Sequence, residues 1–250
     1  MHSPDQERLA DDDSAHASWM RLYALAGVCA LLIFLVALVD IVTMVFEGES
    51  IAPGKMGAIG WFALLQHNRY LGLRNLGVLN IVNTILEIPL FLALYHAHRR
   101  ADRAFALLAV ILLAVETSVY ISRNAVFSIH TLSIQYEAAT TETEKAALRT
   151  AGQALLGLGE DLTPGMFMGF FLTELAGLVM SVVMLRGRVF GRWAAWIGLL
   201  GFGCLLGFNV FAAFVPAIYS AALIAGTVGG LAAMAWYILV ARRQFQLRVA

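Results

Sequence analysis

Three glutamates lie inside segments that are otherwise apolar, and they are the residues of this sequence most suited to chemistry. Counted at about 1.5 Å per residue from the ends of their segments, Glu87, Glu116 and Glu174 fall near one depth, close to the middle of a bilayer. An ionisable group at that depth costs about 2.5 to 3.5 kcal/mol on insertion scales, so we expect all three to point inward and meet. Carboxyl groups crowded at low dielectric cannot all stay ionised, so at least one should hold a proton unless a cation compensates.

Other polar residues share helical faces with these acids. Arg123 follows Glu116 on the same face, two turns away, and is the expected internal counter-charge. Asp40 and a headgroup phosphate are competing partners for this arginine. The candidate ligand- or ion-binding residues are therefore Glu87, Glu116, Glu174, Arg123, Asn80, Asn83, Tyr120 and Asp40.

This pattern allows two interpretations, which the sequence leaves open. The acids could line a polar cavity within the membrane that faces the extracytoplasmic side and binds or senses a small ligand, a lipid headgroup, a proton or a cation. Alternatively, the polar groups form interhelical hydrogen bonds that set helix register, each worth about 0.6 to 2 kcal/mol. We favour binding, sensing or permeation over catalysis.

Three further functions remain as alternatives. An intramembrane enzyme could use one protonated glutamate as general acid and another as base on a lipid-like substrate. A small secondary transporter would need two inverted halves, and no similarity between the two halves of this chain is visible. A structural accessory protein would need no cavity. No histidine accompanies the acids, which argues against a zinc hydrolase, and we expect no metal and no cofactor.

The elements that position these residues follow from composition. Of the 250 residues, 60% are hydrophobic and 14% charged, and the mean hydropathy is +0.76, which indicates an integral membrane protein in contact with the lipid bilayer. We predict an all-α, polytopic bundle of six membrane-spanning helices within a domain covering residues 19–241. The spans lie near residues 20–46, 71–97, 102–126, 161–187, 190–216 and 217–241.

The charged residues predict the orientation. A disordered acidic tail, residues 1–18, precedes the first span, and a basic tail, residues 242–250, follows the last. With six spans, the side that carries both termini holds eleven of the 17 lysines and arginines. The positive-inside rule then places both termini in the cytoplasm. The net charge of zero gives no indication of nucleic-acid binding.

The longer connections are predicted on the extracytoplasmic side. Residues 50–70 carry Trp61, Phe62 and Tyr70, which favour the headgroup boundary, so we expect this segment to lie on the membrane. Thr141 and Glu144 have capping-box spacing and should begin an amphipathic surface helix over residues 141–158.

Glycine spacing predicts a close approach of the last two spans. GxxxG pairs occur at residues 203 and 207 in the fifth span and at 226 and 230 in the sixth. We expect these faces to pack within one chain, with a homodimer through them as the alternative.

Three stretches resemble a known family. They are "NTILEIPLFLALY" with its acid in span 2, "VETSVYISRN" with its acid and arginine in span 3, and "GRVFGRWAAWIGLLG" at the start of span 5. In these the chain resembles an uncharacterised family of bacterial six-helix integral membrane proteins, described as a domain of unknown function. The resemblance implies a multipass plasma-membrane protein without an assigned activity.

Overall fold

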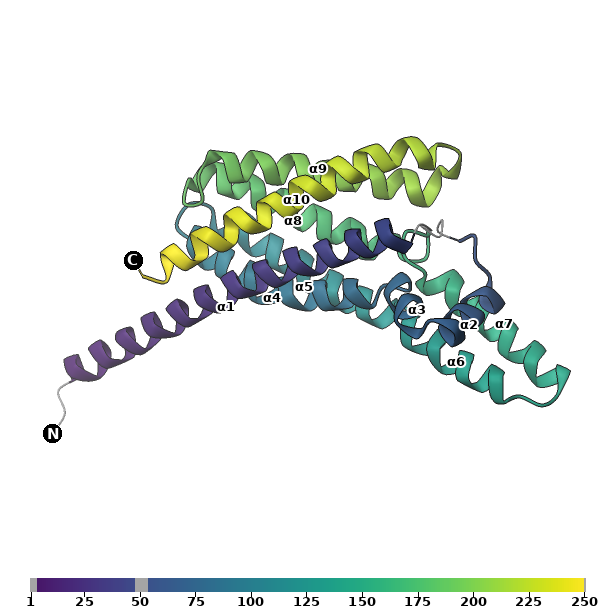
Figure 1. Ribbon diagram of the computed structural model, residues 1–250. Helices are drawn as coiled ribbons and strands as arrows, with labels where there is room; N and C mark the ends of the chain where they lie inside the picture. The colour runs from purple at the N-terminus through teal and green to yellow at the C-terminus, as the bar shows by residue number, and fades with distance from the viewer. Residues whose placement is uncertain (1–3, 48–53, 250) are drawn as a thin grey trace.

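The protein is described by a computed structural model that covers residues 4–47 and 54–249. Every regular element in these ranges is a helix (Figure 1). In chain order they are α1 (Pro4–Glu47), α2 (Ala58–His67), α3 (Arg69–Asn75), α4 (Val78–His98), α5 (Arg103–Arg123), α6 (Val126–Ala138), α7 (Glu142–Gly159), α8 (Phe167–Gly187), α9 (Arg192–Phe214), the single 3₁₀ turn η1 (Pro216–Ile218) and α10 (Tyr219–Leu247).

Six helical segments are long and apolar enough to cross a membrane, which confirms the predicted all-α class and the number of spans. They are Ala17–Thr43, Val78–His98, Arg103–Ala138, Phe167–Gly187, Arg192–Phe214 and Tyr219–Leu247. The third segment runs over two helices, because Asn124 and Ala125 interrupt it between α5 and α6.

Some boundaries differ from the prediction. α1 begins at Pro4, so the segment predicted as a disordered tail is helical from residue 4 onward. Extending an existing helix adds one hydrogen bond per residue, and this explains how a polar segment can continue a stable span. The second span begins at Val78, since Gly77 adopts φ +93° and separates α3 from α4. α10 runs to Leu247, into the predicted basic tail.

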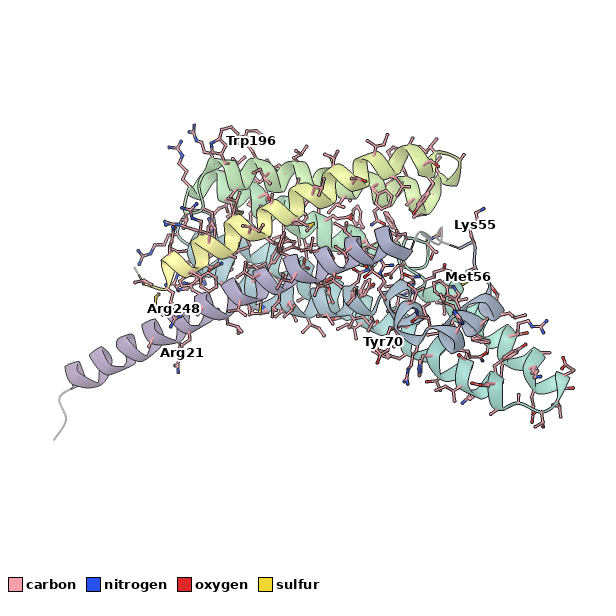
Figure 2. The ribbon with its side chains drawn as sticks, viewed as in Figure 1. Arg21, Lys55, Met56, Tyr70, Trp196 and Arg248 are labelled. Atoms are coloured by element: carbon pink, nitrogen blue, oxygen red, sulfur yellow. The ribbon has the colours of Figure 1, made fainter. Side chains whose placement is uncertain are left out.

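The long helices form a ring. Each packs against two neighbours, in the order α1, α4, α5, α8, α9 and α10, and α10 returns to α1. The first residues of α1 and the last residues of α10 lie at one end of this ring, which we call the terminal end (Figure 1). α2, α3, α6 and α7 lie at the opposite, distal end. Arg21 and Arg248 are at the terminal end, whereas Lys55 and Tyr70 are at the distal end (Figure 2).

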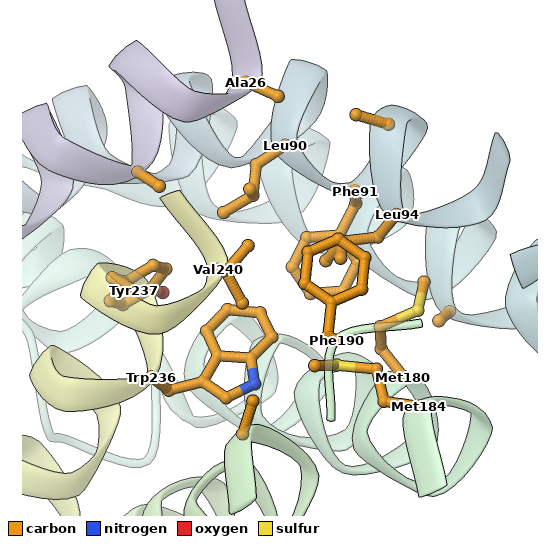
Figure 3. Packing of buried hydrophobic residues seen from close by; sticks show 14 of the residues in the cluster. Ala26, Leu90, Phe91, Leu94, Met180, Met184, Phe190, Trp236, Tyr237 and Val240 are labelled. Carbon is orange, nitrogen blue, oxygen red and sulfur yellow. The ribbon is translucent and has the colours of Figure 1, made fainter. Parts of the chain in front are cut away.

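Apolar side chains fill the ring on the terminal side of the glutamates (Figure 3). Leu90, Phe91 and Leu94 of α4 are at most 1% exposed, and they pack in one cluster with Met180 of α8 and Trp236 of α10. This half of the bundle is therefore a close-packed apolar core.

α9 and α10 approach each other closely, as predicted, but mostly through other glycines. A Cβ on Gly201 would come within 2.9 Å of the α10 backbone, and one on Gly229 within 2.8 Å of the α9 backbone. Of the predicted glycines, Gly226 meets a ring of α9, whereas Gly207 and Gly230 face open space. GxxxG spacing identifies a face of small residues on each helix. In this structure the two helices meet mainly through the neighbouring face, which carries Gly201 on α9 and Gly229 on α10.

The helices α2, α6 and α7 form a separate small core at the distal end. Trp61 and Phe62 are 2% and 1% exposed in it, so these two side chains pack inside the protein. Gly152 of α7 allows this packing, since its missing side chain leaves the space that the ring of Phe62 approaches. The predicted capping box of Thr141 and Glu144 is confirmed at the start of α7. The α6 helix that completes this core was not predicted.

Candidate functional site

Glu87 and Glu116 lie together inside the ring, and we call them the acid pair. They are 5% and 2% exposed and near enough for their charges to repel. Thr84 donates its hydroxyl proton to the Glu116 carboxyl group from 2.7 Å, and Tyr237 of α10 donates to Glu87. Thr117 adds a contact of 3.2 Å to Glu116. The partners of the acid pair in the described chain are thus hydroxyl groups, and the three salt bridges of that part of the chain do not include either acid.

Glu174 lies apart from the acid pair. It is 6% exposed on α8, and its Oε2 accepts a hydrogen bond of 3.3 Å from Asn209 of α9. The equal depth of the three glutamates therefore does not bring all three side chains to one another. Depth follows from position along a helix, whereas meeting also requires each helix to turn its acid toward the same neighbour.

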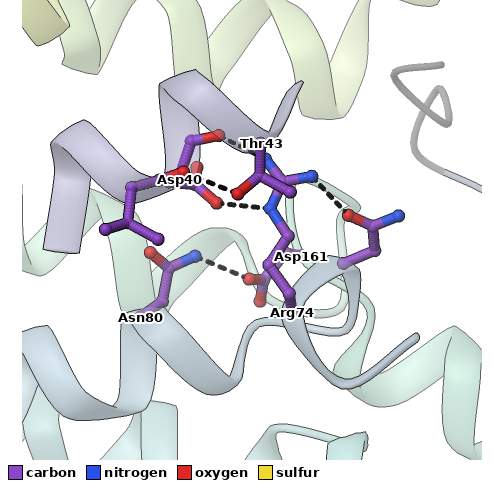
Figure 4. Close-up of polar contacts among 7 residues, drawn as sticks. Asp40, Thr43, Arg74, Asn80 and Asp161 are labelled. Atoms are coloured by element: carbon purple, nitrogen blue, oxygen red, sulfur yellow. Dashed lines mark hydrogen bonds and ion pairs between the residues drawn. The ribbon is translucent and has the colours of Figure 1, made fainter. Parts of the chain in front are cut away.

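Asp161, in the connection between α7 and α8, forms the second acidic centre. Its carboxylate accepts a hydrogen bond from Asn80 at 2.9 Å (Figure 4). It also accepts from the Tyr120 hydroxyl at 2.7 and 2.8 Å. Asn124 approaches the same group at 3.4 Å. We call these four residues the Asp161 cluster; it joins the α7–α8 connection to α4 and α5.

Burial is the main reason that the pKa of Asp161 rises from its ordinary value of 3.8 to about 6. The hydrogen bonds from Asn80 and Tyr120 act in the opposite direction, because they favour the charged form. The neighbouring carboxylates of Glu160 and Asp40 add to the rise. A carboxyl group with this pKa changes its charge close to physiological pH.

Gly77 makes the Asp161 cluster possible. A Cβ at this position would lie 2.3 Å from Asp161 Oδ2 and 2.9 Å from both the Tyr120 hydroxyl and Asn124 Nδ2. Its φ of +93° is also a conformation that side chains other than glycine's rarely adopt. The backbone at the start of α4 can thus approach the carboxylate only because residue 77 has no side chain.

The two acidic centres are stacked along α4 and α5. Asn80 and Thr84 are one turn apart on α4, and Tyr120 and Glu116 are one turn apart on α5. Four residues rise about 6 Å along a helix, so neutral donors at two successive levels form a ladder between Asp161 at the distal end and the acid pair.

Asp40 and Arg74 form a separate ion pair near the Asp161 cluster. Arg74 Nε donates to Asp40 Oδ1 at 2.8 Å, and its Nη2 donates to the Asp40 backbone carbonyl at 2.7 Å (Figure 4). The predicted counter-charge, Arg123, is instead exposed and donates to the carbonyl of Gly165 at 3.1 Å. Its place at the last residue of α5 explains this, since two helical turns separate it from Glu116.

Asn83 belongs to neither acidic centre. Its side-chain oxygen is buried and has no hydrogen-bond partner among the described residues. The structure gives no reason for this.

A pocket of about 420 Å³ opens beside the Asp161 cluster, and we call it the distal pocket. Both chain neighbours of Asp161, Glu160 and Leu162, line it, together with Gln153, Thr163 and the ends of α7 and α9. Burial raises the pKa of Glu160, whose Oε1 accepts a hydrogen bond of 2.9 Å from the Gly54 amide. Leu162 has φ +59°, an uncommon conformation for a side-chain-bearing residue. None of the three predicted glutamates lines this pocket.

Metal-ligating residues do not gather in the part of the chain that the structure describes. Within residues 4–47 and 54–249, no group of three or more His, Cys, Asp and Glu residues could hold a metal ion.

Sequence reasoning missed Asp161 and Tyr237 as site residues. Asp161 is the first residue of the predicted fourth span, and an acid at the end of a helix is common and indicates no special site. A signal was available in the run "GEDLTPG", which places two acids before a proline and glycine, a composition typical of a structured turn. Tyr237 gave no signal, because it lies in a span without acids.

The comparisons with known proteins identify a family and nothing closer. A family model described as "Domain of unknown function (DUF4386)" matches residues 25–241. No curated protein and no solved structure matched the chain.

Proposed function

We propose that this protein, a multipass membrane protein that belongs to the DUF4386 family, binds and senses protons that reach it from the distal end. In this proposal Asp161 takes up a proton near pH 6, and the acid pair holds a proton deeper in the bundle. The supporting observation is the Asp161 cluster, in which one carboxylate with a pKa of about 6 joins the α7–α8 connection to α4 and α5 through uncharged donors.

Protonation of Asp161 would strengthen this junction. The donors Tyr120, Asn80 and Asn124 favour the charged carboxylate, but burial opposes the charge more strongly, because the pKa is raised to about 6. If the connection opened, water would solvate the carboxylate and its pKa would return toward 3.8, so the closed junction binds the proton more tightly than an open one. We infer that acidification holds the α7–α8 connection more firmly against α4 and α5.

The same hydrogen bonds favour a proton over a metal cation as the bound species. Both oxygens of Asp161 already accept from N–H or O–H donors, and a cation would need free carboxylate oxygens. The acid pair is likewise occupied by the hydroxyl groups of Thr84 and Tyr237. A proton needs only one lone pair, and the distal pocket beside Glu160 supplies its route from water.

Sensing is favoured over permeation because the ladder of polar groups stops at the acid pair. On the terminal side of Glu87 the ring is filled by Leu90, Phe91 and Leu94 with their partners (Figure 3). The acid pair also does not line the distal pocket, which weighs against carboxyl catalysis on a lipid-like substrate.

The orientation is part of the proposal. The excess of arginine at the terminal end supports an orientation with both termini in the cytoplasm, in the plasma (inner) membrane. The distal pocket then faces the extracytoplasmic side, so the protein would respond to external pH.

Hydrogen–deuterium exchange of the purified protein in lipid nanodiscs tests the sensing role. After correction for intrinsic exchange, we expect the amides of residues 160–166 and 76–80 to gain protection between pH 7.5 and pH 5. Asp161→Asn should abolish this pH response, while Glu137→Gln, which changes an exposed carboxylate on α6, should keep it. An equal pH response in the wild type and Asp161→Asn would refute the proposal.

A further inference from the structure

A second pocket, of about 360 Å³, lies at the terminal end of the ring, where α4 turns into α5. Its lining consists of Tyr95, Arg99 and Arg100 from the end of α4 and Arg103 from the start of α5. We call it the basic pocket. The three arginines are exposed, and none of them takes part in a salt bridge within the described chain.

The one acid in this turn is already engaged. Asp102 accepts a hydrogen bond from the Phe105 amide as the N-cap of α5, and it forms an ion pair with Arg186 of α8. Within the part of the chain whose side chains are described, the positive charge of the basic pocket is therefore left without an anion. Three guanidinium groups around one concave space suit a phosphate group, which they can bind through paired N–H donors.

Aromatic residues position one of these arginines. The guanidinium of Arg99 lies 5.9 Å from the centre of the Trp19 ring, and Trp19 stacks on His96 at 3.8 Å. Such a contact holds an arginine by cation–π attraction and leaves its N–H groups for another partner. Tryptophan is also typical of the headgroup level of a bilayer, which places the basic pocket at that level.

The surface next to the basic pocket is apolar and exposed. On α5, Leu107 and Ile111 follow Arg103 by one and two turns and are 43% and 51% exposed. On α4, Leu92 and Ile88 precede Tyr95 on the same side and are 37% and 39% exposed. Acyl chains could lie along this strip while a headgroup occupies the basic pocket.

We propose that the basic pocket binds the phosphate headgroup of an anionic phospholipid in the leaflet at the terminal end. The charge of the pocket selects a phosphate, and the adjoining apolar strip selects a phosphate attached to acyl chains rather than the free ion. This would make the α4–α5 turn a specific lipid site, independent of the acids in the bundle.

Native mass spectrometry of the full-length protein with phosphatidylglycerol, phosphatidylcholine or inorganic phosphate tests this proposal. We expect the wild type to bind phosphatidylglycerol in preference to phosphatidylcholine. The triple variant Arg99→Gln, Arg100→Gln, Arg103→Gln should lose about tenfold to a hundredfold in affinity for phosphatidylglycerol. The matched control changes three exposed arginines elsewhere at the terminal end, Arg192→Gln, Arg242→Gln and Arg248→Gln, and should bind nearly as the wild type does.

Each other outcome would overturn the assignment. An equal loss in the control variant would mean general charge attraction, and displacement of the lipid by inorganic phosphate would make the free ion the ligand. Should the triple variant fail to fold, Arg103→Gln alone, a single exposed substitution, is expected to weaken phosphatidylglycerol binding about fivefold. Unchanged binding by Arg103→Gln would also contradict the proposal.

Discussion

Replacing Asp161 with asparagine should remove a pH dependence from the stability of the folded protein. The pKa of Asp161 is about 6 in the folded protein, above its ordinary 3.8, so the folded state binds this proton more readily than the unfolded state. The stabilisation from this group is therefore fully present below about pH 4 and is lost as the pH rises through about 6.

The size of the effect follows from the two pKa values. A difference between 3.8 and about 6 corresponds to roughly 3 kcal/mol, because one pKa unit is about 1.36 kcal/mol. The Asp161 side chain is half-buried, and screening by water reduces this to about 1 to 3 kcal/mol. For a chain of this length the change in Tm is about 2 to 4 °C per kcal/mol.

Differential scanning fluorimetry in one detergent, at pH values from 4 to 8, measures how the Tm depends on pH. As the pH rises from 4 to 7, the Tm of the wild type should fall relative to that of Asp161→Asn, by about 2 to 12 °C. The asparagine can keep Tyr120 as a donor if Asn80 turns its amide to accept, so the variant should fold. Glu137→Gln controls for the loss of an exposed carboxylate. Parallel Tm curves for the wild type and Asp161→Asn would refute the reasoning.

The remaining predictions concern the neighbours of the site and the distal helices. Gly77→Ala should lower the free energy of unfolding by about 2 kcal/mol or more, because residue 77 has a positive φ and a Cβ there would clash with Asp161. Gly157→Ala is the control, since its Cβ would meet open space, and it should be neutral or stabilising. Thermal unfolding of the two variants tests the difference. Tyr237→Phe leaves buried Glu87 without its donor and should cost about 1 to 3 kcal/mol, measured by thermal unfolding against the wild type; an unchanged Tm would contradict the contact. Thr141→Ala should cost α7 about 1 kcal/mol, visible as faster hydrogen exchange in its first turn, and exchange at the wild-type rate would show that the capping box contributes nothing.

Much of the fold follows from the sequence, because length and hydropathy decide where a helix crosses a membrane. The polar face of α4 could also be predicted from the sequence. Asn80 and Glu87 are expected on one face of this helix, and both side chains bind polar partners inside the ring. The capping box of α7 was local and could be read from Thr141 and Glu144 alone. These features depend on one helix at a time.

The sequence was insufficient where two or more helices meet. Glu174 shares its depth with the acid pair, yet α8 turns it toward Asn209 of α9, and a helical wheel carries no information on that rotation. Asp40 pairs with Arg74 rather than Arg123 because the chain before the turn at Gly77 brings the Arg74 side chain to α1. Trp61 shows the same limit, since its burial depends on an α6–α7 hairpin that comes much later in the chain.

The central claim is that Asp161 takes up a proton near neutral pH, and infrared difference spectroscopy measures this directly. A titration of the wild-type protein from pH 8 to pH 4 should show a protonated-carboxyl C=O band that grows with a midpoint near pH 6. Asp161→Asn should lose this component, while Glu174→Gln, which changes an acid outside the Asp161 cluster, should retain it. A midpoint near the ordinary 3.8, or a pH 6 component that persists in Asp161→Asn, would contradict the account.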